Sequence, residues 1–157
     1  SLEKIAYLKK RNKINGQIMT NSQSYNKKTN DYNLTKNQKI VFNLLQNSGE
    51  PLKAYTILES LKREGLKSPL QVYRALDKLV ELGIIHKIES QNSFIACSNS
   101  NCASNTAFTI CRKCGDVKEI KNNHLFEQVS DLGKKNRLKV QRFNLEFYVD
   151  CNGCKVN

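Results

Sequence analysis

The stretch PLQVYRALDKLVELGIIHKIESQNSFIAC, residues 69–97, decides the fold because its apolar pattern changes halfway along. In the first half, Val72, Leu76 and Leu79 are spaced as they would be on one face of a helix. In the second half, two short apolar runs flank a polar turn at residues 90–93, which is typical of a β-hairpin. The stretch therefore predicts a helix that leads directly into a hairpin.

Two more short helices are predicted upstream of this stretch. Thr35 and Gln38 have the spacing of a capping box, so a first helix should begin there, and residues 48–51, which include Gly and Pro, should end it. A second helix is expected from about Ala54 to Glu64. Three short helices followed by a hairpin predict a winged helix-turn-helix, a fold that places its third helix in the major groove of DNA.

The rest of the chain predicts a second, smaller α/β domain, so the expected fold class is α+β. Its last strand is long, and a long strand in a small domain has an edge that a second subunit would cover. The expected order is strand 107–110, strand 117–120, helix 124–136 and strand 140–149. The expected domains are a flexible basic segment 1–33, a winged-helix DNA-binding domain 34–97, a hinge 98–106, and a dimerisation and zinc domain 107–157.

The N-terminal residues 1–33 are rich in Asn, Lys, Ser and Gln and poor in apolar residues, which predicts a mobile segment. The single methionine is Met19, and translation from there would make residues 1–18 an extension; the sequence leaves this open. No apolar run has the length of a transmembrane helix, and no signal peptide pattern is present. We therefore expect a cytoplasmic protein with no membrane partner.

Four of the six cysteines form two Cys-x-x-Cys pairs, Cys111 with Cys114 and Cys151 with Cys154. Four thiolates in two such pairs are the ligand set of a tetrahedral, structural zinc site. Two disulfides are the alternative. They are disfavoured because a Cys-x-x-Cys disulfide closes a strained small ring and the sequence lacks an export signal.

A second metal site is indicated within the hairpin. If the turn is centred on residues 91–92, His86 directly faces Cys97, at a separation that allows an imidazole and a thiolate to hold one zinc ion. A lone histidine or cysteine would more often belong to the core. The remaining ligands should come from the connector or the second domain, where Cys102 and Glu119 are the candidates.

The charge balance predicts a polyanionic partner. The chain has 26 Lys+Arg against 14 Asp+Glu, and a net charge of +12 exceeds what solubility alone requires. Nucleic acid is the simplest such partner. An enzyme is disfavoured, because two histidines and seven glycines leave little catalytic machinery, and the His-x-Glu and Pro-Cys-x-x-Cys motifs of zinc deaminases are absent. We therefore expect no enzymatic activity and no small-molecule substrate.

From about Leu34 to Cys154 the sequence resembles the ferric uptake regulator family, and within it the zinc uptake regulator branch. No single motif is specific, but together they are. The matching stretches are Leu34-Thr35, Ala54-Tyr55, Val72-Tyr73-Arg74-Ala75-Leu76-Asp77, His86-Lys87-Ile88-Glu89-Ser90, Asn92-Ser93-Phe94, Cys111-x-x-Cys114-Gly115 and Cys151-x-x-Cys154.

The resemblance implies a homodimeric, metal-activated repressor with an N-terminal winged helix and a C-terminal dimerisation domain. The four paired cysteines match the family's structural zinc, while His86, Cys97 and Glu119 match three ligands of the sensing site in the zinc branch. The fourth is normally a histidine, and Ser104 occupies its position; we hypothesise that Cys102 replaces it, with water or His124 as the next candidates. Two zinc ions per monomer are thus expected, one structural and one regulatory. Thiolate ligands favour zinc over iron.

The expected function is zinc-dependent binding of an operator in double-stranded DNA, with repression of zinc-uptake genes. Arg74 is the expected base reader, as a bidentate donor to a purine edge, and Tyr73 matches a family tyrosine that packs on a thymine methyl or a phosphate. The expected DNA-contacting residues are Lys36, Tyr55, Ser68, Gln71, Tyr73 and Arg74. An iron- or peroxide-sensing member of the same family, or a metal-independent zinc-ribbon adaptor, is the alternative.

Overall fold

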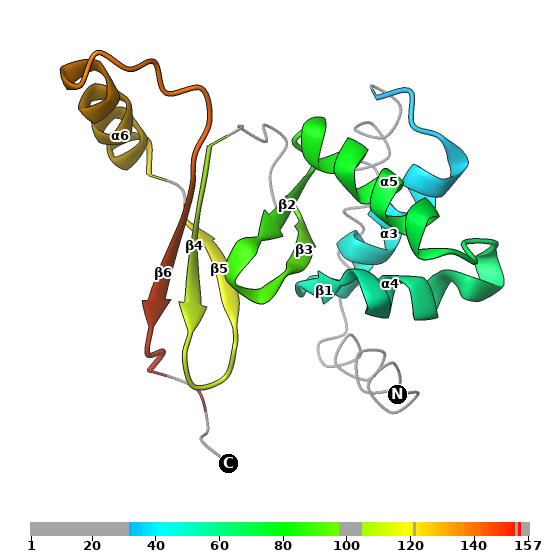
Figure 1. The fold of residues 1–157 in the computed structure, drawn as a ribbon. Coiled ribbons are helices and arrows are strands. Elements are labelled where there is room, and N and C mark those ends of the chain that lie inside the picture. Colours follow the sequence, from blue (N-terminus) through cyan, green and yellow to red (C-terminus); the bar gives the residue numbers. More distant parts are fainter. Residues whose placement is uncertain (1–31, 98–104, 121, 153, 155–157) are drawn as a thin grey trace, which may run out of the picture.

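The computed structural model describes residues 32–97, 105–120, 122–152 and 154 (Figure 1). The predicted flexible segment 1–33 and hinge 98–106 therefore lie largely outside the described residues, as does Cys102. The helices are α3 (Lys36–Ser48), α4 (Ala54–Leu61), α5 (Pro69–Glu81) and α6 (Asn123–Lys135), with short 3-10 turns η1 (Lys62–Glu64) and η2 (Glu89–Gln91). The strands are β1 (Leu52–Lys53), β2 (Ile85–Ile88), β3 (Ser93–Ala96), β4 (Thr106–Cys111), β5 (Val117–Ile120) and β6 (Asn144–Val149).

The three helices α3, α4 and α5 enclose one apolar core, as the sequence predicts. The capping box at Thr35 and Gln38 starts α3. The second helix, α4, ends at Leu61 and not near Glu64 as predicted, because the chain continues as the 3-10 turn η1, which Gly65 ends with a φ of 103°. Leu45, Ile57 and Leu76 are fully buried, and the small sheet β1-β3-β2 packs beside the helices. This half of the molecule is a winged helix-turn-helix, and we call its hairpin, residues 85–96, the wing.

The wing has a different register from the predicted one. His86 lies opposite Ile95, so the prediction that it directly faces Cys97 is wrong. The turn η2 ends at Asn92, which has a left-handed φ of 47°, and this lets Ser93 pair at once with Ile88. The centre of the hairpin consequently moves toward the N-terminus, and Cys97 instead donates its backbone N–H to the carbonyl of Ile84 at 3.0 Å.

The second sheet has the order β5-β4-β6, with β4 antiparallel to β5 and parallel to β6 (Figure 1). Helix α6 connects β5 to β6. The last strand is shorter than predicted, since it begins at Asn144 and not at Val140. Val140 packs against Gly133 of α6, and Leu138 donates its N–H to the Gly133 carbonyl at 2.9 Å, so this segment closes the end of the helix before the strand begins.

The wing contacts the second sheet through an apolar cluster. Ile88 from the wing is buried together with Phe108 and Ile110 from β4, and Ile95 and Val117 pack against them. In Figure 1 the wing accordingly lies between the helices and the second sheet. The predicted α+β class, a winged helix-turn-helix followed by a small α/β unit, is confirmed. Among the described helices, none combines the length and apolarity required to cross a membrane.

Candidate metal centres

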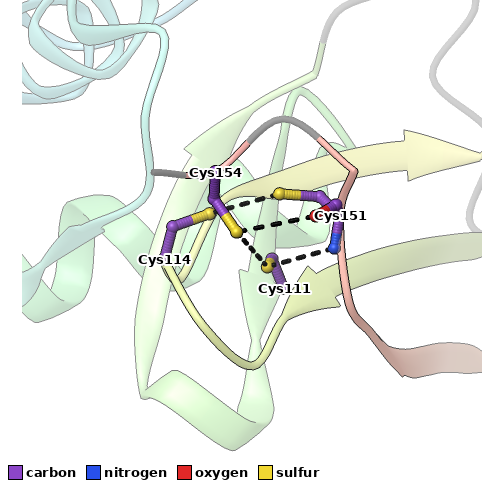
Figure 2. A group of neighbouring side chains, drawn as sticks. All are labelled: Cys111, Cys114, Cys151 and Cys154. Carbon is purple, nitrogen blue, oxygen red and sulfur yellow. Dashed lines mark hydrogen bonds between the residues drawn. The ribbon is translucent and has the colours of Figure 1, made fainter. Parts of the chain in front are cut away.

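The fold brings the four paired cysteines to one end of the second sheet (Figure 2). Cys111 is the last residue of β4, and Cys151 follows shortly after β6. Because β4 and β6 are parallel, they end at the same edge, where Arg112 donates its N–H to the carbonyl of Val149 at 2.8 Å. Each Cys-x-x-Cys turn continues from one of these strand ends.

The sulfur atoms have the separations of a tetrahedral zinc site. All four ligand atoms lie within 4.8 Å of one another, with 3.9 Å between the sulfurs of Cys111 and Cys154 and 3.7 Å between those of Cys114 and Cys151. A tetrahedron with Zn–S bonds of about 2.3 Å has S···S edges of about 3.8 Å. These two separations and the compact grouping of the four sulfurs fit a structural zinc site.

Hydrogen bonding divides the protons unequally among these thiols. The backbone N–H of Cys151 lies 3.4 Å from the sulfur of Cys111 and, as the main cause, lowers the pKa of the Cys111 thiol to about 6. The neighbouring side chain of Cys151 and then desolvation raise the pKa of the Cys154 thiol to about 12. One thiolate is therefore ready at neutral pH, whereas Cys154 must release a proton when a metal binds.

A second group of ligand atoms joins the wing to the second sheet. The ligand atoms of His86 on β2, Cys97 just after β3 and Glu119 on β5 lie within 4.8 Å of one another. His86 and Cys97 are buried, with 8% and 5% of their surface exposed. They meet despite the corrected register because Cys97 is two residues beyond the partner of His86, so both side chains lie on one face of the wing.

The donor chemistry of this group suits zinc. One imidazole, one thiolate and one carboxylate are all common zinc ligands, and a thiolate disfavours magnesium and calcium. A cavity of about 440 Å³ has Ile95, Phe108 and Glu119 among its lining residues. Cys97 is disulfide-bonded in the structure, so metal ligation requires its reduced thiol. Of the candidates for a fourth ligand, Cys102 lies outside the described residues, and His124 on α6 contacts Gln128 at 3.2 Å, apart from this group.

The residues predicted to contact DNA divide into two kinds. Arg74 and Tyr73 are exposed on α5, and Tyr55 is 72% exposed at the start of α4. Ser68 and Gln71 instead form a capping box at the start of α5. The Gln71 Oε1 accepts hydrogen bonds from the backbone N–H groups of residues 67 and 68 at 3.0 and 3.2 Å, which commits that oxygen to holding the helix end.

Leu70, beside Gln71 at the start of α5, is a large apolar residue that is 57% exposed, and the sequence-based predictions did not include it. The available signal was its position, since Leu70 lies off the apolar face formed by Val72, Leu76 and Leu79. Lys36, also predicted to contact DNA, is exposed as the first residue of α3.

A winged helix-turn-helix joined to a zinc-binding α/β unit defines a class of metal-binding proteins with a DNA-binding fold. Within that class, the chain belongs to the Ferric uptake regulator family, whose family model matches residues 29–148. It is 40% identical over 88 residues to the zinc uptake regulation proteins of Escherichia coli (strain K12) and Shigella flexneri. The match covers 55% of this chain and 52% of each relative, so the chain spans about half the length of the curated relatives it matches.

Solved structures extend the similarity over most of the chain. A structure described as a zinc uptake regulator complexed with zinc and DNA matches with a TM-score of 0.77 and 28% identity, over 88% of this chain and 96% of that one. Holo XcZur matches with a TM-score of 0.70 and 34% identity, over 77% and 85%. The ferric uptake regulator from Francisella tularensis, at 19% identity and a TM-score of 0.53, shares the fold.

Proposed function

We propose that this protein is a zinc-responsive transcriptional repressor, which binds its operator as a homodimer when the sensing site is filled and so represses zinc-uptake genes. The observation that carries this proposal is the meeting of His86, Cys97 and Glu119 at the junction of the wing and the second sheet. A metal ion held there would connect the DNA-binding half to the other half. The similarity to zinc uptake regulators, one of them described with zinc and DNA, supports the choice of metal and partner.

In this proposal each monomer holds two zinc ions with different roles. The ion at Cys111, Cys114, Cys151 and Cys154 is structural, because four thiolates close the coordination shell. The ion at the group of His86, Cys97 and Glu119 is regulatory, with Cys102 proposed as the fourth ligand. When bound there, zinc supplies a link between strands that belong to different sheets.

In the proposed mechanism, zinc binding reduces the conformational freedom of the winged-helix half relative to the second sheet. Filling the sensing site restricts the winged helices relative to the second sheet and fixes the spacing of the two α5 helices in the dimer. Operator binding then requires less ordering, so its affinity rises. Because such coupling is reciprocal, operator DNA should tighten zinc binding by the same factor.

The proposed DNA-facing surface follows the exposed side of the helices. Arg74 is the proposed base reader, Tyr73 and Tyr55 contact bases or phosphates, and Lys36 contacts phosphates. Ser68 and Gln71 act mainly by holding the start of α5 in place.

Other parts of the surface suit a second subunit. Phe147 and Tyr148 on the edge strand β6 are 40% and 61% exposed, and Leu132 and Leu138 near the end of α6 are 62% and 66% exposed. Exposed apolar side chains on and beside a free strand edge suit pairing between two copies of the chain. We propose a cytoplasmic homodimer that has no catalytic role and takes no small-molecule substrate.

The test uses the only two histidines in the chain as a matched pair. His86→Gln removes one ligand of the sensing site, whereas His124→Gln changes an exposed histidine of α6. Under reducing conditions, zinc content and operator binding are measured with and without a mild chelator. We expect two zinc ions per monomer in the wild type, one exchangeable, and operator binding that follows the exchangeable ion. His86→Gln should lose that ion and the zinc response, while His124→Gln retains both.

The same measurements separate the alternatives. Operator binding that follows ferrous iron, or that is lost on peroxide treatment, would indicate an iron or peroxide sensor. A single inert zinc with DNA binding unaffected by the chelator would indicate the zinc-ribbon adaptor. Either result would contradict the proposal.

A further inference from the structure

The edge strand β6 reaches across to the wing through a carboxylate. The Oε1 of Glu146 accepts a hydrogen bond from the backbone N–H of Glu89 at 2.7 Å, and its Oε2 accepts one from the N–H of Ser90 at 3.2 Å. These bonds join residues that are 57 and 56 positions apart in the sequence. Hydrogen bonds to an ionised carboxylate are shorter and stronger than neutral ones, so this is a strong contact between the two halves.

Asn144 makes a second contact from the same strand. Its Nδ2 donates to the backbone carbonyl of Lys87 at 3.3 Å, and its Oδ1 lies 3.3 Å from the hydroxyl of Thr106 on β4. Residues two apart on a strand face the same side, so Asn144 and Glu146 reach the wing together. We call this pair, with the backbone groups of residues 87, 89 and 90, the wing clasp.

The wing clasp involves protein groups alone. It holds the β2 side of the hairpin and its turn, immediately after His86, the residue that supplies the wing's imidazole to the sensing group. Beneath it, Ile88 is fully buried against Phe108 and Ile110 of β4. The wing therefore has an apolar contact and three hydrogen bonds to the second sheet that need no metal ion.

We propose that Glu146 is a positioning residue that holds the wing in its docked orientation before the sensing metal binds, and so sets the zinc concentration at which operator binding begins. This inference rests on the proposed function, because it assumes that a filled sensing site favours operator binding. A ligand that binds one conformation has an apparent affinity scaled by the fraction of protein already in that conformation. Loss of the wing clasp lowers that fraction, so more zinc is needed to dock the wing.

The test compares three variants of the full chain. Glu146→Ala removes both acceptors, and Glu146→Gln keeps the shape and one acceptor but turns an amide N–H₂ group toward the second backbone donor. Glu127→Gln on the exposed side of α6 is the matched control, because it removes the same negative charge and so has the same non-specific effect on DNA affinity. Operator binding is measured against buffered free zinc under reducing conditions.

We expect the zinc midpoint to rise about tenfold in Glu146→Ala and by a smaller factor in Glu146→Gln. Saturating zinc should restore the operator affinity of the wild type, because the metal then supplies the docking. The control should keep the wild-type midpoint. Equal midpoints in Glu146→Ala and Glu127→Gln would overturn the proposal.

Amide hydrogen exchange tests the wing clasp directly, in protein that retains the structural zinc but has lost the exchangeable metal. The N–H groups of Glu89 and Ser90 should exchange slowly in the wild type and faster in Glu146→Ala. Fast exchange of both amides in the wild type would show that the wing clasp is open without metal and would overturn the proposal. This measurement is independent of the proposed function. The proposed function would be contradicted by a different result, namely operator binding by the wild type that does not depend on zinc.

Discussion

At the scale of single residues, two residues of α5 that were both predicted to contact DNA differ in their contacts within the protein. Gln71 is engaged in the capping box with Ser68, whereas Arg74 projects from the exposed side of the same helix. A capping residue affects the stability of the helix start, typically by about 1 kcal/mol. An arginine that reads a base affects the choice of sequence.

Replacing Arg74 should therefore change specificity. We expect Arg74→Ala to weaken binding at one base pair of the operator by about 1–3 kcal/mol and to relax the preference at that position. Arg63→Ala, an equal charge change at an exposed site in η1, is the control and should not alter sequence preference. Binding to a panel of single-base operator variants provides the measurement. A uniform loss on every sequence would make Arg74 a phosphate contact instead.

At the scale of elements, local chemistry predicted the start of the first helix. The capping box at Thr35 acts within a few residues of the boundary, so the sequence alone contains it. The start of β6 was different. Residues 140–143 have the alternating pattern of a strand, but in the structure Val140 packs against Gly133 of α6 and the strand begins only at Asn144. This contact depends on the tertiary fold, so the local sequence does not indicate it.

Gly133 is required by this close approach. A Cβ added there would lie 2.4 Å from the Cγ2 of Val140 and 3.2 Å from the carbonyl oxygen of Leu138. Gly133→Ala should therefore lower the free energy of unfolding by about 1–3 kcal/mol, although alanine is the better helix former. Thermal or urea unfolding gives the value. Adding Val140→Ala should recover part of the loss, and a stable Gly133→Ala single variant would contradict the packing argument.

At the scale of the whole molecule, both groups of candidate metal ligands lie where separate parts of the chain meet. The sequence predicted the four-cysteine cluster because spacing alone implies it. It also predicted that His86 and Cys97 lie close together, although from a wrong register. The two side chains are still close because the register differs by two residues, and residues two apart on a strand lie on the same face. The turn η2 caused that error, since 3-10 turns of this kind have little sequence signature. The role of Glu146 was not predicted because hydrogen bonds between the wing and the second sheet arise only in the folded chain.

Acid should remove the structural ion and loosen the second sheet. Zinc requires thiolates, so binding displaces a proton from Cys154, whose thiol pKa is raised, and below about pH 6 protons also compete at Cys111, whose thiol pKa is lowered. Zinc affinity should thus fall with decreasing pH, and most steeply below about pH 6, where binding must displace a proton from Cys111 as well. A colorimetric zinc indicator and near-ultraviolet circular dichroism, followed from about pH 8 to about pH 5, provide the measurement. Retention of the zinc ion at pH 5 would contradict this prediction. Removal of the zinc by a chelator at pH 8 is the control that separates the effect of metal loss from other effects of acid.

The parallel pairing of β4 with β6 also has a consequence for biosynthesis. Cys111 and Cys114 leave the ribosome early, but their partners follow only after β5, α6 and β6 have been translated. Until then the nascent chain exposes only two of the four cysteines, which cannot enclose the ion. A product truncated before Cys151 would consequently remain unloaded, and zinc incorporation would mark the chains whose second sheet has been completed.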